Sequence, residues 1–255
     1  METIPELAGL FVAAFAAGAL NAVAGGGSLI SFPALVAVGQ PAILANATNT
    51  AALWPGTLSS ALAYRRDTAA HRDLLVVLLL PSVVGGLLGA LVLVNTPAAL
   101  FDEVVPFLVL FATALFALRD VITRWTGAAA RREEHVTWAG RVGGFLFQLF
   151  VATYGGYFGA GIGILMLASL SVMGLRDLHR MNGLKTVLGT LINVIAFVFF
   201  AINRLVVWHL AALMAAGAIL GGWISARVAR RIDQRWLRAF VVAVGLGVSV
   251  WLFVR

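Results

Sequence analysis

Long runs of apolar residues alternate with short polar or glycine-rich breaks over nearly the whole chain. Several of the runs are long enough to cross a bilayer as an α-helix. The runs and the breaks between them predict helices at 7–24, 29–38, 42–64, 74–94, 98–118, 142–157, 161–173, 177–202, 205–228 and 235–254. The pattern therefore predicts an all-α, polytopic membrane protein.

Two of the breaks consist largely of glycine. The first includes Gly25, Gly26 and Gly27, and the second is "GGYFGAG" at 155–161. Irregular backbone at membrane depth is tolerated only where it is buried in protein or lines a cavity. We predict that each break is the turn of a helical hairpin beside a cavity. The shortness of the second arms favours hairpins that re-enter the bilayer, although the sequence leaves a full crossing open.

The second half of the chain repeats the first. "AGGGSLISFPALVAVG" at 24–39 aligns with "GAGIGILMLASLSVMG" at 159–174, and "PSVVGGLLGALV" at 81–92 aligns with "GAILGGWISARV" at 217–228. Between them, "ANATNT" aligns with "RMNGLKT" with one extra residue. Matches in the same order at a nearly constant offset predict a duplication. Each repeat would hold a glycine-broken hairpin and three transmembrane helices, at 4–118 and 142–254, joined by a connector at 119–141.

Composition and charge agree with a membrane setting. The chain is 61% hydrophobic and 11% charged, with a mean hydropathy of +0.97. The net charge of +7 does not indicate nucleic-acid binding, because the arginines cluster in short loops between apolar runs. There is no cysteine, which excludes disulfides and thiolate metal sites. We expect a multi-pass protein of the cell membrane whose surroundings are the lipid bilayer.

The arginine clusters also predict the orientation of the two halves. By the positive-inside rule, the loops that contain Arg65, Arg131, Arg176 and Arg230 are cytoplasmic. The equivalent loops of the other half carry few basic residues or none. Equivalent loops therefore lie on opposite sides of the membrane, which makes the halves inverted repeats. This arrangement places both termini outside the cytoplasm and the connector inside.

The glycine hairpins and the helices after them resemble the TauE/SafE family of membrane transporters, the sulfite exporter family. The resemblance rests on "AGGGSLISFPALVAVG", "ANATNT", "YGGYFGAGIGILMLASLSVMGL" and "MNGLKT", and it extends over almost the whole chain. It implies transport, usually outward, of small sulfur-containing anions such as sulfite, sulfonates or sulfoacetate. The second half departs from the first where Ala168 stands at the position that matches Pro33, so the two hairpins would differ in stiffness.

Lys185 is the most informative single residue. It is the only lysine of the chain and lies about nine residues, or roughly 13 Å, into the helix predicted at 177–202. A charge at membrane depth costs a few kcal/mol unless it is paired or hydrated, so such groups mark functional sites. The alternative is a side chain that reaches back to the cytoplasmic interface. Its mate in the first repeat is the uncharged Asn49.

Amides, hydroxyls and free N–H groups at the start of the second hairpin arms suit the oxygens of an anion. For the amides and hydroxyls the competing interpretation is hydrogen bonding between helices. The predicted substrate-binding residues are Gly25, Gly26, Gly27, Ser28, Asn46, Asn49, Thr50, Gly159, Gly161, Gly163, Asn182, Lys185 and Thr186. Asn21 and Asn193 are weaker candidates of the same kind.

These features favour a secondary transporter that alternates access around a midplane site between the repeats. No nucleotide-binding motif, metal motif or catalytic group of residues is visible in the sequence, and we expect no cofactor and no catalytic or metal-binding residue. A passive anion channel, or an integral membrane enzyme or assembly factor using the same cavity, are the alternatives. The sequence leaves open the identity of the anion, the direction of flux, any coupling ion and the oligomeric state.

Overall fold

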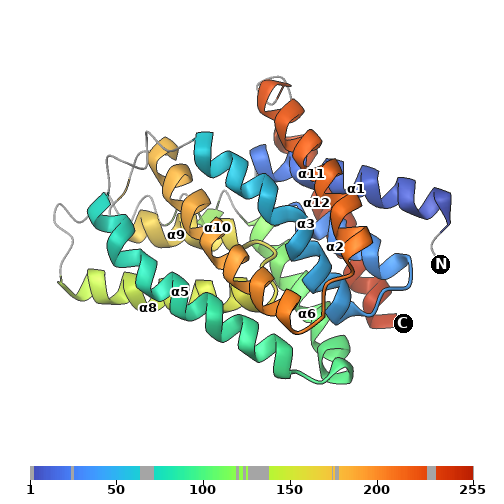
Figure 1. Cartoon of the computed structure of the whole chain (residues 1–255). Coiled ribbons are helices and arrows are strands. Elements are labelled where there is room, and N and C mark those ends of the chain that lie inside the picture. The colour runs from blue at the N-terminus through green and yellow to red at the C-terminus, as the bar shows by residue number, and fades with distance from the viewer. Residues whose placement is uncertain are drawn as a thin grey trace.

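The computed structural model describes residues 3–23, 26–63, 72–118, 121–122, 125, 138–173, 175, 178–228 and 234–254. Within them the chain forms ten helices (Figure 1): α1 (Ile4–Val23), α2 (Ser28–Ala37), α3 (Ala42–Ala63), α5 (Arg72–Asn95), α6 (Ala98–Ala117), α8 (Trp138–Tyr157), α9 (Ile162–Val172), α10 (Leu178–Ile202), α11 (Trp208–Val228) and α12 (Gln234–Val254). Each predicted apolar run is a helix, with ends that differ by about four residues or fewer, so the all-α prediction is confirmed.

Both glycine breaks interrupt the helices where the sequence predicts. The first separates α1 from α2, and the second separates α8 from α9. Helices α2 and α9 have 10 and 11 residues, so each extends about 15 Å, half the thickness of a bilayer core. Most of the predicted connector at 119–141 lies outside the described residues, although α8 already begins inside it at Trp138.

Glycines allow two pairs of helices to pack with their backbones in contact. Helix α11 lies along α1, and α5 lies along α8. A Cβ atom added at Gly221 would lie 1.9 Å from a backbone carbonyl oxygen of α1, and one at Gly89 would lie 2.1 Å from a backbone carbonyl oxygen of α8. The small-residue pairs that contain them, Gly217 with Gly221 and Gly85 with Gly89, therefore serve close helix packing, as their spacing predicts.

The outer surface of the bundle is apolar. Four helices in the described residues, α1, α5, α6 and α10, contain segments long and apolar enough to cross a membrane. Large exposed side chains on the outside include Leu80 and Leu88 of α5, Phe107 of α6, and Phe240 and Val250 of α12. Such a surface is stable in contact with lipid tails but not with water.

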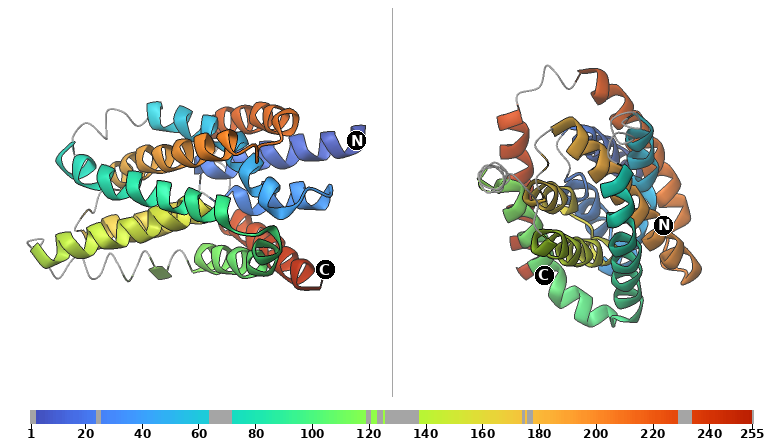
Figure 2. Two further views of the ribbon diagram at one scale, coloured as in Figure 1. Left: turned by 60° about the horizontal axis from the view of Figure 1, so that its bottom comes forward. Right: turned by 90° about the vertical axis from the view of Figure 1, so that its left-hand side faces the viewer.

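Helices α3 and α10 pack on each other in the interior, and each also contacts the short arm of its own hairpin. The start of α1 and the end of α12 lie at the same end of the molecule (Figures 1 and 2). The end of α3 and the starts of α5, α8 and α10 gather at the opposite end (Figure 1). Most of the arginine-rich loop residues, including Arg65, Arg131, Arg176 and Arg230, lie outside the described residues.

Candidate functional site

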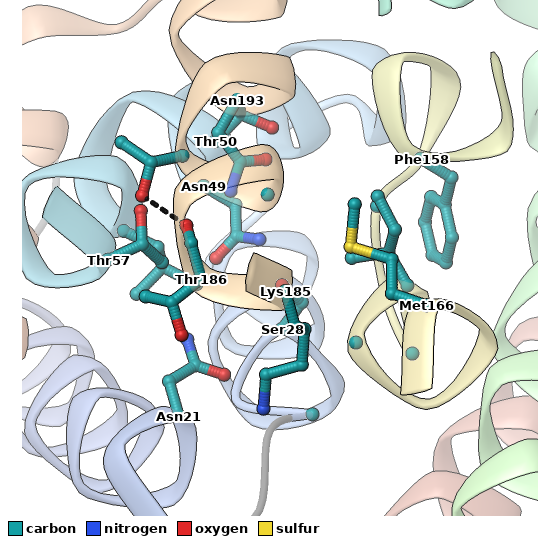
Figure 3. Close-up of a pocket in the computed structure, with 18 of the residues that line it drawn as sticks. Asn21, Ser28, Asn49, Thr50, Thr57, Phe158, Met166, Lys185, Thr186 and Asn193 are labelled. Atoms are coloured by element: carbon teal, nitrogen blue, oxygen red, sulfur yellow. Dashed lines mark hydrogen bonds between the residues drawn. The ribbon is translucent and has the colours of Figure 1, made fainter. Parts of the chain in front are cut away.

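A cavity of about 140 Å³ lies where the two hairpin turns meet α3 and α10 (Figure 3). All four of these elements contribute lining residues. Most of the polar groups come from α3 and α10, whereas Phe158 and Met166 form an apolar wall on the side of the second hairpin. The two breaks in the helices therefore open onto one shared space, as expected for irregular backbone at membrane depth.

An asparagine of α1 holds the first hairpin turn. The Oδ1 atom of Asn21 accepts a hydrogen bond of 2.8 Å from the backbone N–H of Gly27. Gly26 has a φ of +88°, a left-handed conformation that favours glycine, and a Cβ atom there would lie 2.8 Å from the ring of Phe116. Helix α2 begins immediately afterwards at Ser28, which lines the cavity.

A tyrosine of α8 holds the second turn. The Tyr154 hydroxyl donates a hydrogen bond of 2.6 Å to the backbone carbonyl of Ala160. Gly159 and Gly161 have φ values of +80° and +78° and line the cavity. The turn therefore requires glycine at both positions, and it places the start of α9 at the cavity.

Lys185 lies in the cavity wall and is half-buried. Its Nζ atom donates a hydrogen bond of 2.9 Å to Oδ1 of Asn182, one turn earlier on α10. The stem of the lysine packs beside Gly163, where an added Cβ atom would lie 3.4 Å from Cδ of the lysine. The absence of a side chain at Gly163 leaves room for the lysine against the start of α9.

A buried serine of α2 orients Asn49 of α3. The Ser31 hydroxyl donates a hydrogen bond of 2.5 Å to Oδ1 of Asn49, and the two residues are 0% and 2% exposed. Since Asn49 also lines the cavity, this bond joins the short arm of the first hairpin to the cavity wall.

The three asparagines just described share one feature. The amide oxygens of Asn21, Asn49 and Asn182 each accept a hydrogen bond, from Gly27, Ser31 and Lys185 respectively. Their amide nitrogens donate no hydrogen bond to the described residues and remain available as donors. All three residues line the cavity.

Two backbone N–H groups add to these donors. Those of Ser28 and Gly163, at the starts of α2 and α9, donate no hydrogen bond to the described residues, and both residues line the cavity. The first N–H groups of a helix carry a partial positive charge and attract anions. Together with the ammonium of Lys185, these groups give the cavity a surplus of hydrogen-bond donors.

The structure brings most of the predicted site residues together. The predicted residues that line the cavity are Gly26, Ser28, Asn49, Thr50, Gly159, Gly161, Gly163, Asn182, Lys185 and Thr186. The weaker candidates Asn21 and Asn193 also line it. Gly27 lies behind the first turn, where an added Cβ atom would lie 2.2 Å from the carbonyl oxygen of Ala17. Gly25 lies outside the described residues.

Asn46, like Gly27, is a predicted site residue that does not line the cavity. Its amide nitrogen donates a hydrogen bond of 2.8 Å to the backbone carbonyl of Tyr157, and its side chain is 1% exposed. The bond joins α3 to the end of α8, which is the alternative that the sequence left open for this asparagine. Substrate binding by the other candidates stays a prediction.

Several lining residues were not predicted: Leu53, Thr57, Phe158, Ile162, Met166, Gly189 and Thr190. A signal for some of them was present in the helical spacing. Leu53 and Thr57 follow Asn49 at intervals of one turn, and Thr190 follows Thr186 by one turn. Extending each polar face by one turn would have found them.

Comparison with known proteins identifies the setting of this cavity. A family model described as sulfite exporter TauE/SafE matches residues 10–252. A probable membrane transporter protein of Haemophilus influenzae is 31% identical over 94% of the chain and 91% of the relative. A probable membrane transporter protein of a Sinorhizobium species is 30% identical over 96% of the chain and 92% of its own length. The probable membrane transporter protein YfcA of Escherichia coli is 28% identical over 95% of the chain and 88% of its own length. No solved structure shows a significant match.

Proposed function

The chain belongs to the TauE/SafE sulfite exporter family, and we propose that it is a secondary transporter that exports small sulfur-containing anions, such as sulfite or short sulfonates. The family is one of membrane transporters, so the chain is a multi-pass membrane transporter and not an enzyme. The proposal adds a substrate class, a site and a mechanism to that assignment.

The donor-rich cavity is the observation that carries the proposal. Three amide nitrogens, two backbone N–H groups and the ammonium of Lys185 surround one space. Sulfite and sulfonate groups carry three oxygens, each of which can accept more than one hydrogen bond. An anion that leaves water for this cavity regains hydrogen bonds and a positive charge, which offsets the cost of its desolvation.

The packing of the helices supports an inverted repeat. Helix α1 packs on α11 and its proposed mate α8 packs on α5, the proposed mate of α11. The contacts of α3 with α11 and of α10 with α5 exchange in the same way, and α6 packs on α12. The site lies between the halves, where alternating access through rocking of one repeat against the other would expose it to each side in turn.

The lengths of α2 and α9 support re-entrant hairpins. At about 15 Å, neither helix can cross a hydrocarbon core of about 30 Å. Two half-length arms that begin at one cavity place their N-terminal N–H groups near the middle of the membrane. Discontinuous helices in other transporters bind anionic groups in this way.

Flux and binding measurements on the purified protein test the proposal. We expect sulfite and short sulfonates to raise the Tm in detergent and to exchange across proteoliposomes with saturable rates. Trans-loaded sulfonate should accelerate uptake, because a carrier returns faster when it is occupied. Linear, non-saturable flux would indicate a channel instead. Binding of neutral sulfones as tight as that of sulfonates would contradict an anion site.

The repeat orientation has a separate test. With the arginine-rich loops in the cytoplasm, both termini lie outside it. A periplasmic reporter fused after residue 255 should therefore be active, and a cytoplasmic reporter at the same position should be silent. The opposite pattern would overturn the inverted repeat while leaving the cavity unaffected.

A further inference from the structure

The threonine hydroxyls in the cavity wall offer a ligand hydrogen-bond acceptors and not donors. Each of the four lining threonines donates its hydroxyl hydrogen to a carbonyl of its own helix. On α3, the Thr50 hydroxyl donates to the carbonyl of Asn46 at 3.0 Å, and that of Thr57 donates to the carbonyl of Trp54 at 2.8 Å. On α10, the Thr186 hydroxyl donates to the carbonyl of Asn182 at 2.6 Å, and that of Thr190 donates to the carbonyl of Thr186 at 2.7 Å. With the hydrogen used in this way, only the oxygen lone pairs can meet a ligand.

The acceptors and the cation occupy different parts of the cavity. Thr190 lies five residues after Lys185, about 7.5 Å farther along the axis of α10. In Figure 3 the side chain of Lys185 extends away from Thr57 and Asn193. A ligand whose charged oxygens contact Lys185 therefore has hydroxyl lone pairs near its opposite end.

Lone pairs buried against an anion's apolar end would be costly, since a desolvated acceptor without a donor loses the free energy of its hydrogen bond to water. Thr190 is only 7% exposed, so water has limited access to it. A donor on the ligand removes this cost.

We propose that the substrate carries an anionic group and, on the side away from its charged oxygens, a hydrogen-bond donor that is either a hydroxyl or an ammonium group. This inference rests on the proposed function. It assigns the anionic group to the end of the cavity at Lys185, Ser28 and Gly163. It assigns the donor to the hydroxyl oxygens of Thr57 and Thr190.

A matched pair of sulfonates tests the inference. Isethionate ends in a hydroxyl group, and propanesulfonate has a methyl group of similar size in its place. We expect the wild-type protein to bind isethionate about fivefold more tightly or more, by calorimetry in detergent, because one net hydrogen bond is made. The Thr190→Val and Thr57→Val variants should each reduce this preference to about twofold or less, because the loss of an acceptor weakens isethionate binding more than propanesulfonate binding.

Thr113→Val is the control. Thr113 is also buried and donates to a carbonyl of its own helix, Val109, but it lies on α6 and does not line the cavity. It should retain the full preference. Equal affinities of the wild type for the two sulfonates, or a preference that survives in both valine variants, would overturn the inference and leave the anion site intact.

Two further outcomes are distinguishable. If neither sulfonate binds and Lys185→Met leaves anion exchange unchanged, the proposed function fails and the inference fails with it. If replacing choline chloride by sodium chloride tightens propanesulfonate binding, and Thr190→Val abolishes that gain, the hydroxyl oxygens bind an inorganic cation. That result would overturn the assignment of the acceptors to the substrate.

Discussion

The hairpin turn between α1 and α2 and the turn between α8 and α9 share a backbone plan but differ in side chains. In both, glycine adopts a positive φ and a short helix then begins at the cavity. The first turn is held by the amide of Asn21, which itself lines the cavity. The second is held by the hydroxyl of Tyr154, which does not.

The same division extends to α3 and α10. Asn49 and Lys185 are mates in the predicted repeat, yet one is neutral and held by Ser31 whereas the other is charged and bonds Asn182. The backbone places two equivalent groups at the cavity, and the side chains decide what each offers. Equivalent substitutions in the two halves should therefore have unequal effects on binding.

The largest effects are expected at the turn glycines. Gly26→Leu should abolish transport, because it combines a strained φ with a collision against Phe116. Gly161→Leu should also abolish transport through its φ of +78°, with less damage to packing, since an added Cβ atom would lie 3.5 Å from its nearest neighbour. The measurement is sulfonate exchange in proteoliposomes, with membrane insertion checked separately.

Gly9→Leu is the control for these two, because a Cβ atom there meets nothing within 4 Å. It should insert and transport like the wild type. Wild-type flux in both turn variants would show that the glycines serve packing alone and that the two hairpins are not part of the transport site.

Removing the charge that distinguishes α10 from α3 should have the next largest effect. Lys185→Met keeps the volume but loses the ammonium, so anion affinity should fall at least about tenfold, or about 1.4 kcal/mol. Lys185→Arg should keep part of the affinity, since Arg and Lys differ in reach and hydration. Calorimetry with one confirmed sulfonate measures the dissociation constant for the wild type and both variants.

Arg204→Met tests whether any lost positive charge gives the same result. Arg204 is exposed and lies outside the cavity, so its loss should leave the dissociation constant unchanged. Equal constants for the wild type and Lys185→Met would remove the lysine from the site and indicate a side chain that reaches the membrane interface.

Ser31→Ala should weaken binding by a smaller factor, about threefold to tenfold. The Asn49 amide loses the bond that orients it, so its oxygen becomes free to turn toward the anion. Ser249→Ala is the control, because Ser249 is equally buried but donates to Gly245 of its own helix, away from the cavity. Unchanged affinity in Ser31→Ala would show that Asn49 is oriented by other contacts.

The smallest effects are expected from the residues that hold the turns, and these effects sharpen the comparison between the hairpins. Tyr154→Phe should lower the free energy of unfolding by about 1 kcal/mol and leave anion affinity unchanged. Asn21→Ala should lower both, since Asn21 holds the turn and also faces the cavity. Thermal shift and calorimetry separate the two properties. A similar loss of affinity in both variants would contradict the distinction.

The sequence by itself determined the helices, the hairpin breaks and the lysine that lines the cavity. These features depend on local properties: the length of each apolar run, the conformational freedom of glycine, and the cost of a charge at membrane depth. The glycine pairs of α5 and α11 were identifiable as packing residues for the same reason, because their spacing places them on one face of a helix.

Only the tertiary structure decided which polar groups face the cavity and with which atoms. Asn46 and Asn49 are close in sequence, yet Asn46 bonds Tyr157, which is 111 residues away, while Asn49 is held by Ser31 and lines the cavity. Whether an amide presents its oxygen or its nitrogen depends on the partner that occupies the other atom. These partners belong to other helices, so the residue pattern along one helix cannot predict them.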